Sequence, residues 1–239
     1  MTVVLLHALA ADARMWAGTL TGHPVLTPDL YRLGTGEPSL DTVVDGLARL
    51  LDDRGEDRAV LVGCSFGGYA AMAFLRRHPD RVRGLGLIGT RAAADTDEER
   101  ARRLGFAERV TDPALGPALV DATAPLLLGA GTRRRRPDLR GRVDEMVRSI
   151  APADVAWAQR AIAARTASFD VLAAYTGPAV VLAGAEDALV PLDDARAMAA
   201  TLPRGALEVV PDAGHLLPLE APEVVDKALA SLLDQREDS

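Results

Sequence analysis

The pentapeptide Gly-Cys-Ser-Phe-Gly at residues 63–67 places one serine, Ser65, between two glycines. It follows an apolar run at 59–62 and precedes a helix-like run at 68–75. Glycine on each side suits a sharp strand-to-helix turn, because a side chain there would collide with the neighbouring strand and helix. Such a turn lifts the serine hydroxyl to the positive end of the helix, where a developing oxyanion is favoured. Ser65 is therefore the candidate nucleophile, and an ordinary serine in a glycine-rich turn is the alternative.

A serine hydroxyl needs a base that takes its proton, and the chain offers only four histidines. His78 lies at the far end of the helix that Ser65 begins, roughly 20 Å away at 1.5 Å rise per residue. His23 starts a strand, on the opposite edge of the sheet, and His7 lies in a loop with another use. His215 follows the last expected strand and precedes the last helix, so it lies at the carboxyl edge of the sheet. We therefore take His215 as the base.

The base in turn needs an acid that orients it, and the segment 180–187 ends in two carboxylates just after a buried strand. Residues in that position lie at the carboxyl edge of a parallel sheet, where such folds build their sites. On this argument either Glu186 or Asp187 can serve. The chain order of serine, acid and histidine is the one associated with a nucleophile elbow.

The elements that would position these residues alternate between short apolar runs and longer amphipathic segments, which is the pattern of a mostly parallel α/β sheet. Strands are expected at 3–7, 24–27, 59–62, 82–88, 179–183 and 206–210, and helices at 12–20, 39–53, 66–77, 192–201 and 222–233.

The alternation stops over residues 91–175, which show helical periodicity, several prolines and no strand pattern. We expect a helical lid of about four helices, inserted into a core domain made of residues 1–90 and 176–239. Charge separates the two parts. The insertion holds 14 arginines and 12 acidic residues, net +2, which leaves 13 of the 27 basic and 22 of the 34 acidic residues elsewhere, net −9.

Composition narrows the class of protein. A length of 239 residues and 49% hydrophobic content support one large domain with an inserted subdomain. The net charge of −7 disfavours a nucleic-acid partner, and no apolar run approaches the ~20 residues of a membrane span. The single cysteine excludes an internal disulfide, and the first residues read as a strand rather than a secretory leader. We expect a cytoplasmic protein with a small-molecule substrate, no metal, and no nucleic-acid or membrane partner.

Several other residues invite a functional interpretation. Cys64 beside the serine suggests a thiol mechanism, but its position one residue before the turn tip favours a place in the core. The arginines at 133–136 look like a nucleic-acid patch, yet they lack interleaved aromatic residues and favour a solvated face. Trp157 and Phe106 could line a pocket or pack within the insertion. Tyr31, near the carboxyl end of an expected strand, is a candidate for the pocket border.

Taken together, these motifs resemble the α/β-hydrolase superfamily, and within it small lactonase and esterase members such as 3-oxoadipate enol-lactonases. The resemblance implies that Asp187 rather than Glu186 is the acid beside Ser65 and His215, and that the backbone N–H groups of Leu9 and Phe66 form an oxyanion hole. It implies no metal and no cofactor. It rests on Leu5-Leu6-His7, Pro28-Asp29-Leu30, the serine turn, and the segments at 77–82, 184–187, 190–191, 213–215 and 218–222.

The chain departs from this family pattern in three places. Ala8 follows His7 where many members have glycine, and residues 31–37 replace the usual Arg-Gly-x-Gly-x-Ser. The antiparallel strand pair that often precedes the first parallel strand is missing. We therefore expect about six parallel strands rather than eight.

The expected function is hydrolysis of a carboxylic ester or lactone through an acyl-enzyme. Thioesterase, C–C-bond hydrolase and lyase or cyclase chemistry are alternatives, because a fold does not fix a function. A non-catalytic small-molecule binding protein is the alternative from another class. The arginines of the insertion either bind a substrate carboxylate or pair with the insertion's own acids, and we favour the second.

Overall fold

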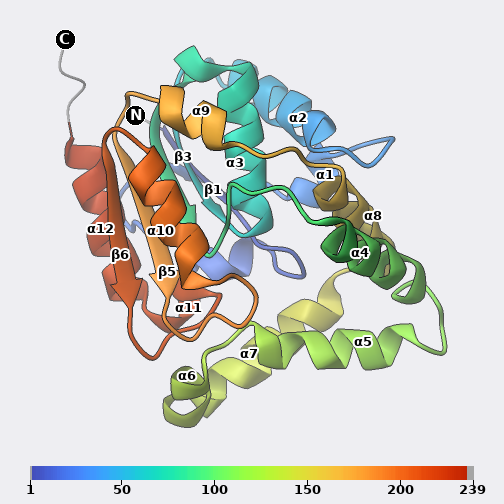
Figure 1. The fold of residues 1–239 in the computed structure, drawn as a ribbon. Coiled ribbons are helices and arrows are strands. Elements are labelled where there is room, and N and C mark those ends of the chain that lie inside the picture. The colour runs from blue at the N-terminus through green and yellow to red at the C-terminus, as the bar shows by residue number, and fades with distance from the viewer. Residues whose placement is uncertain (1, 236–239) are drawn as a thin grey trace.

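Six parallel strands form one sheet in the computed structural model, which describes residues 2–235 (Figure 1). The prediction of about six parallel strands is confirmed, and each predicted strand lies within two residues of an observed one. Along the sheet the order is β2-β1-β3-β4-β5-β6. The strands are β1 (Thr2–Leu6), β2 (Val25–Leu26), β3 (Ala59–Cys64), β4 (Val82–Ile88), β5 (Ala179–Gly184) and β6 (Gly205–Val210).

Helices cover both faces of the sheet, because successive strand residues point to opposite faces. In β1, Val4 and Leu6 belong to one buried cluster and Val3 and Leu5 to the other. The first cluster includes residues of α2 (Leu40–Asp52), α3 (Phe66–Arg77) and α10 (Leu192–Thr201), and the second includes residues of α11 (Leu217–Glu220) and α12 (Pro222–Asp234). None of the helices in the described part of the chain is long and apolar enough to cross a bilayer.

One predicted helix is wrong over most of its length. In place of a helix over 12–20, the structure has a single 3-10 turn, η1 (Ala13–Trp16). Gly18 and Leu20 have φ angles of +90° and +51°, which an α-helix cannot contain. Two short helices were also not expected, α1 (Leu30–Leu33) and α11.

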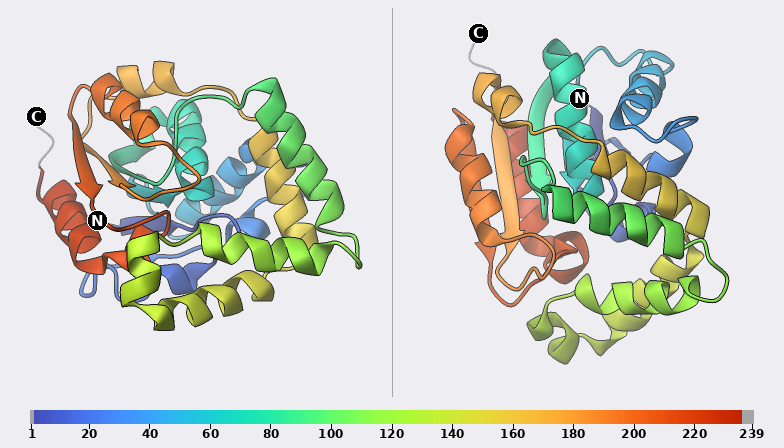
Figure 2. Two further views of the ribbon diagram at one scale, coloured as in Figure 1. Left: turned by 60° about the horizontal axis from the view of Figure 1, so that its bottom comes forward. Right: turned by 45° about the vertical axis from the view of Figure 1, so that its right-hand side comes forward.

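Between β4 and β5, where the structure describes every residue, the chain forms six α-helices and no strand. Four of the six contain eight or more residues. Figures 1 and 2 show α4 to α8 grouped on one side of the molecule, whereas α9 lies beside the sheet, in contact with α3 and α10. The six are α4 (Asp97–Arg109), α5 (Gly116–Thr123), α6 (Ala130–Arg135), α7 (Pro137–Ser149), α8 (Pro152–Ala163) and α9 (Phe169–Ala174).

A buried carboxylate ties this helical segment together. Asp95 has a side chain only 2% exposed and forms ion pairs of 2.6 Å with Arg91, 2.7 Å with Arg103 and 2.8 Å with Arg165. Burial alone would raise the pKa of Asp95, but the hydrogen bonds and charges of Arg165 and Arg103 outweigh it and hold that pKa at about 2. The three arginines come from the start of the stretch, from α4 and from the turn after α8, so one carboxylate fixes three segments.

We expect Asp95→Asn to lower the free energy of unfolding by about 3–5 kcal/mol at pH 7, because it leaves the buried Arg165 and its neighbour Arg103 without their anion. The folded-state pKa of about 2 lies below that of an ordinary Asp, so the stabilisation is complete above roughly pH 4 and fades as the pH falls toward 2. Urea unfolding at pH 7 and at pH 3 should therefore show a smaller difference between wild type and variant at pH 3. The same substitution at the exposed Asp97 is the control, and an equal effect of both would contradict this account.

Candidate active site

Ser65 occupies the turn between β3 and α3 in a conformation that non-glycine residues rarely adopt, with φ +51° and ψ −109°. Its N–H donates to the carbonyl of Ile88 in β4 at 2.9 Å. Its carbonyl oxygen accepts from the N–H groups of Gly68 and Tyr69 and from the Thr90 hydroxyl at 3.0 Å. These four bonds fix the strained turn from both sides, as such a conformation requires.

The two glycines of the pentapeptide are required by close backbone contacts. A Cβ at Gly63 would lie 2.2 Å from the carbonyl oxygen of Gly67, and a Cβ at Gly67 would lie 2.1 Å from that of Leu6 in β1. Both distances are far inside van der Waals contact. The collision inferred from the pentapeptide therefore exists, and it involves the turn's own backbone and the neighbouring strand.

His215 and Asp187 form a buried hydrogen-bonded pair. Nδ1 of His215 lies 2.8 Å from Oδ2 of Asp187, and the two side chains are 3% and 2% exposed. The other carboxylate oxygen accepts from the N–H groups of Leu189 and Val190 at 2.8 and 3.0 Å, which fixes its orientation. A carboxylate on Nδ1 favours the tautomer that carries its proton there and leaves Nε2 as an acceptor.

The other three histidines are placed differently. His7 is buried, and its Nδ1 lies 2.8 Å from the carbonyl oxygen of Ala8 while its Nε2 accepts from the N–H of Leu30 at 2.9 Å. Both ring nitrogens of His7 thus contact backbone groups, and the side chain holds the chain that follows β1 in place. His78 caps the far end of α3, and His23 is exposed at the start of β2.

Ser65 and His215 line one cavity of about 350 Å³. Its walls are mostly apolar, and most of them come from the helices between β4 and β5. Asp187 lies behind His215, and Leu9 forms part of the wall near Ser65. The apolar residues are Leu9, Ala10, Phe106, Val110, Val120, Leu126, Leu127, Val147, Val155, Ile162, Leu189 and Val190.

Backbone N–H groups at this cavity could stabilise an oxyanion. The N–H of Ala8 donates to the sulfur of Met15 at 3.2 Å, and that of Ala10 donates to the Tyr31 hydroxyl at 2.9 Å. Between them the N–H of Leu9 has no partner among residues 2–235. Phe66 is the first residue of α3, so its N–H is one of the donors that a helix cannot satisfy internally.

Two residues expected at the pocket lie outside this cavity. Tyr31 is buried beneath the loop after β1, where its hydroxyl supports Ala10 and burial raises its pKa. Trp157 donates from Nε1 to the carbonyl of Gly36 at 2.9 Å, and its ring packs so closely on Gly34 that a Cβ there would lie 2.1 Å away. Both aromatic residues brace neighbouring segments.

Cys64 and the arginine run at 133–136 have structural places as well. Cys64 is fully buried, its sulfur points toward the carbonyl of His215 at 3.7 Å, and burial raises the pKa of its thiol. In the run, Arg135 pairs with Asp212 and Arg136 pairs with Asp138 at the surface.

Sequence reasoning did not single out Arg102, an exposed residue that also lines the Ser65 cavity. The cavity-lining residues of α4 recur at helical spacing, at 99, 102, 103 and 106, and Val110 follows directly after the helix, so the periodicity of α4 was the available signal. Of the three arginines at this cavity, Arg91 and Arg103 pair with acids, whereas Arg102 has no ion pair within the described part of the chain.

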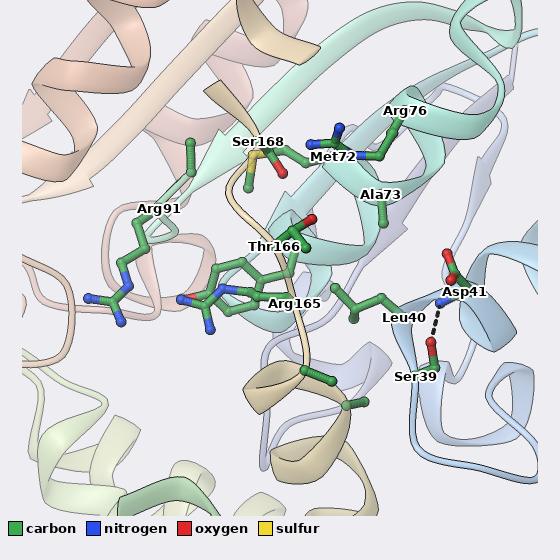
Figure 3. A pocket seen from close by; sticks show the side chains of 14 residues that line it. Ser39, Leu40, Asp41, Met72, Ala73, Arg76, Arg91, Arg165, Thr166 and Ser168 are labelled. Carbon is green, nitrogen blue, oxygen red and sulfur yellow. Dashed lines mark hydrogen bonds between the residues drawn. The ribbon is translucent and has the colours of Figure 1, made fainter. Parts of the chain in front are cut away.

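A smaller cavity of about 140 Å³ adjoins the first and shares Tyr69 and Arg91 with it (Figure 3). Figure 3 shows Arg76, Arg91 and Arg165 around it. Each of these guanidinium groups is paired with a carboxylate, and Arg165 also lies 4.3 Å above the centre of the Tyr69 ring. This cavity is therefore surrounded by arginine charge that is already neutralised.

Comparisons with known proteins agree with this fold. The family described as "alpha/beta hydrolase fold" matches residues 2–222. Lipase LipV of Mycobacterium tuberculosis is 32% identical over 65% of this chain, which spans only 60% of the length of that lipase. An esterase from Thermogutta terrifontis, solved with malate bound, is 36% identical, covers 98% of this chain and 89% of its own, and has a TM-score of 0.90.

An enol-lactonase from Burkholderia xenovorans has the same fold, with a TM-score of 0.85 at 23% identity over 98% of this chain and 91% of its own. The structural likeness extends over nearly the whole chain, and the family match includes the Ser65 turn, the Asp187 loop and the His215 loop. The chain belongs to the alpha/beta hydrolase fold family.

Proposed function

We propose that this protein is a serine hydrolase that cleaves a carboxylic ester or a lactone through an acyl-enzyme, with Ser65, His215 and Asp187 as its triad. The observation that carries the proposal is the buried 2.8 Å hydrogen bond between His215 and Asp187, at the wall of a cavity that Ser65 also lines. The relatives named as lipase and esterase support the same class of chemistry.

In the proposed first step, the oxygen of Ser65 attacks the substrate carbonyl while Nε2 of His215 takes the hydroxyl proton. The negative charge that forms on the carbonyl oxygen is stabilised by the N–H groups of Leu9 and Phe66, at roughly 3–4 kcal/mol per donor. His215 then protonates the leaving alkoxide, and the carbon–oxygen bond breaks. Asp187 stabilises the imidazolium throughout.

Water completes the cycle. His215 removes a proton from a water molecule that attacks the acyl-enzyme, and returns the proton to Ser65 as the acid product leaves. For a lactone, the alkoxide and the acid belong to one molecule. Residues 91–175 act in this proposal as a lid, because they supply most of the apolar wall that would exclude bulk water and set the substrate's shape.

A free carboxylate on the substrate fits one part of this wall. Arg102 faces the cavity without an ion pair from the described residues, whereas Arg91 and Arg103 are held by Asp95 and Glu99. The expectation that the insertion's arginines pair with its own acids thus holds for Arg91 and Arg103 but not for Arg102. Malate, bound in the Thermogutta terrifontis esterase structure, is itself a dicarboxylate.

The rival functions differ in what they require. A thioesterase, C–C-bond hydrolase or lyase on this fold would use the same pair of His215 and Asp187 but would break a different bond. A panel of substrates therefore distinguishes these activities. A binding protein would keep the cavity but would not form a covalent adduct with Ser65.

We expect a fluorophosphonate to label Ser65, and Ser65→Ala to abolish both labelling and turnover. Cys64→Ala should leave labelling largely intact, because the thiol is buried beneath the turn. Mass spectrometry of the labelled peptide provides the test. An adduct on any other residue, or near-normal turnover by Ser65→Ala, would reject the assignment.

Asp187→Asn is expected to lower kcat by about 10³- to 10⁴-fold, because an amide on Nδ1 favours the wrong imidazole tautomer. Glu186→Gln, one residue away, should lose far less. A larger loss for Glu186→Gln than for Asp187→Asn would move the acid to Glu186.

For Arg102, we expect Arg102→Gln to raise KM for a carboxylate-bearing lactone while leaving kinetics on its methyl ester unchanged. The wild type should prefer the acid, and that preference should fall with added salt. Arg100→Gln is the matched control, because Arg100 is exposed on the same helix and does not line the cavity. Equal kcat/KM for acid and ester in the wild type would reject recognition of the carboxylate by Arg102, so that only the apolar wall would select the substrate.

A further inference from the structure

The carboxylate of Glu220 accepts hydrogen bonds from the two backbone groups that flank His215. Its Oε2 accepts from the N–H of Gly214 at 2.9 Å, and its Oε1 accepts from the N–H of Leu216 at 3.1 Å. Glu220 lies at the end of α11, five residues after His215. The segment that carries the imidazole is thus held on both sides by one anion.

The same carboxylate also reaches the insertion. Oε2 of Glu220 accepts from the N–H of Gly129 at 2.8 Å, and Gly129 immediately precedes α6. One oxygen therefore bridges a residue of the insertion and the residue before His215. Because the bonds involve a charged acceptor and backbone donors, each is stronger than a neutral hydrogen bond.

The two backbones that Glu220 joins are in direct contact. A Cβ at Gly214 would lie 2.3 Å from the nitrogen of Gly129, so no side chain fits between them. The N–H of Leu216 also donates to the carbonyl of Leu127 at 3.1 Å. The position of this part of the insertion and the position of the His215 loop cannot change independently.

A second contact lies beside the acid. Glu186 accepts from the N–H of Gly131 at 2.6 Å, and its own N–H donates to the carbonyl of Ala213 at 2.9 Å. The start of α6 is therefore held both at the residue before Asp187 and at the loop of His215. Glu186, an alternative acid on sequence grounds, instead holds the insertion.

We propose that Glu220 is a positioning residue that couples the docking of the 127–131 segment to the orientation of His215. With the three bonds made, the imidazole is held against Asp187 and the lid is seated. Without them, the loop and the lid loosen together. The inference rests on the proposed catalytic role of His215, but its structural half, the coupling of loop and insertion, has a readout that requires no turnover.

The test compares Glu220→Ala, which removes all three bonds, with Glu220→Gln, which keeps one acceptor oxygen but turns an NH2 group toward backbone donors. We expect Glu220→Ala to lower kcat by about 10- to 100-fold with little change in KM for a small activated aryl ester, the size of loss typical of a misplaced catalytic group. Glu220→Gln should show the same pattern to a smaller extent. Glu223→Ala, on the exposed first turn of α12, is the matched control.

Two further measurements separate positioning from a loss of general stability. In the low-field proton NMR spectrum, the Nδ1–H of His215 is identified by its absence in His215→Ala, and we expect this resonance to broaden or disappear in folded Glu220→Ala and Glu220→Gln. In a His215→Ala background, adding Glu220→Ala should cause no further loss of activity, because a residue that acts through the imidazole has nothing left to position.

A folded Glu220→Ala that retains wild-type kcat and an unchanged Nδ1–H resonance would overturn the proposal. So would an additive loss in the His215→Ala background, which would show that Glu220 acts on the lid alone. Failure of the wild type to hydrolyse any ester would instead reject the proposed function, while the resonance and its response to Glu220→Ala would still report on the coupling.

Discussion

The candidate site depends on backbone hydrogen bonds that continue between neighbouring parallel strands beyond their carboxyl ends. The N–H of Ser65 donates to Ile88, that of Gly89 donates to Leu182, and that of Ala185 donates to Val210, all at 2.9–3.0 Å. These bonds cross the sheet from β3 to β6 at one level. They place the serine turn and the acid loop at a common edge, where the loop after β6 brings the histidine. The side chains can meet because the ladder fixes the places from which they start.

On top of that rigid edge, the insertion is attached by buried apolar side chains and by a few charged contacts. Asp95 holds three arginines beside the sheet, and two glutamates accept N–H groups near α6. The intervening wall of the cavity is apolar. This division is physically reasonable, because charged contacts have defined directions and can fix a position, whereas apolar contacts can adapt to a substrate of variable shape.

Much of this arrangement could be predicted from the sequence. The parts that could not be predicted have a common cause. The strands were readable because buried parallel strands are continuous apolar runs, and the Ser65 turn because only glycine fits its close contacts. His215 was reached by elimination among four histidines. Tyr31 and Trp157 were misplaced because an aromatic residue just after a strand, like Tyr31, or on a helix of the insertion, like Trp157, can face the cavity or the layer behind it. That choice depends on partners such as Ala10 and Gly36, which are distant in sequence. The pairing of each insertion arginine is likewise a tertiary fact, since composition gives only the sum of charges.

The position of Cys64 has a practical consequence for site-specific fluorescent labelling of the protein. It is the only cysteine in the chain, and it is completely buried beneath the serine turn with its thiol pKa raised. A thiol of this kind reacts slowly with maleimides, since the thiolate is the reactive form. A cysteine introduced on an exposed face of α5 or α7 would thus accept a fluorophore with little background in an otherwise native chain. A fluorophore can therefore be placed on the insertion without first removing a residue from the core.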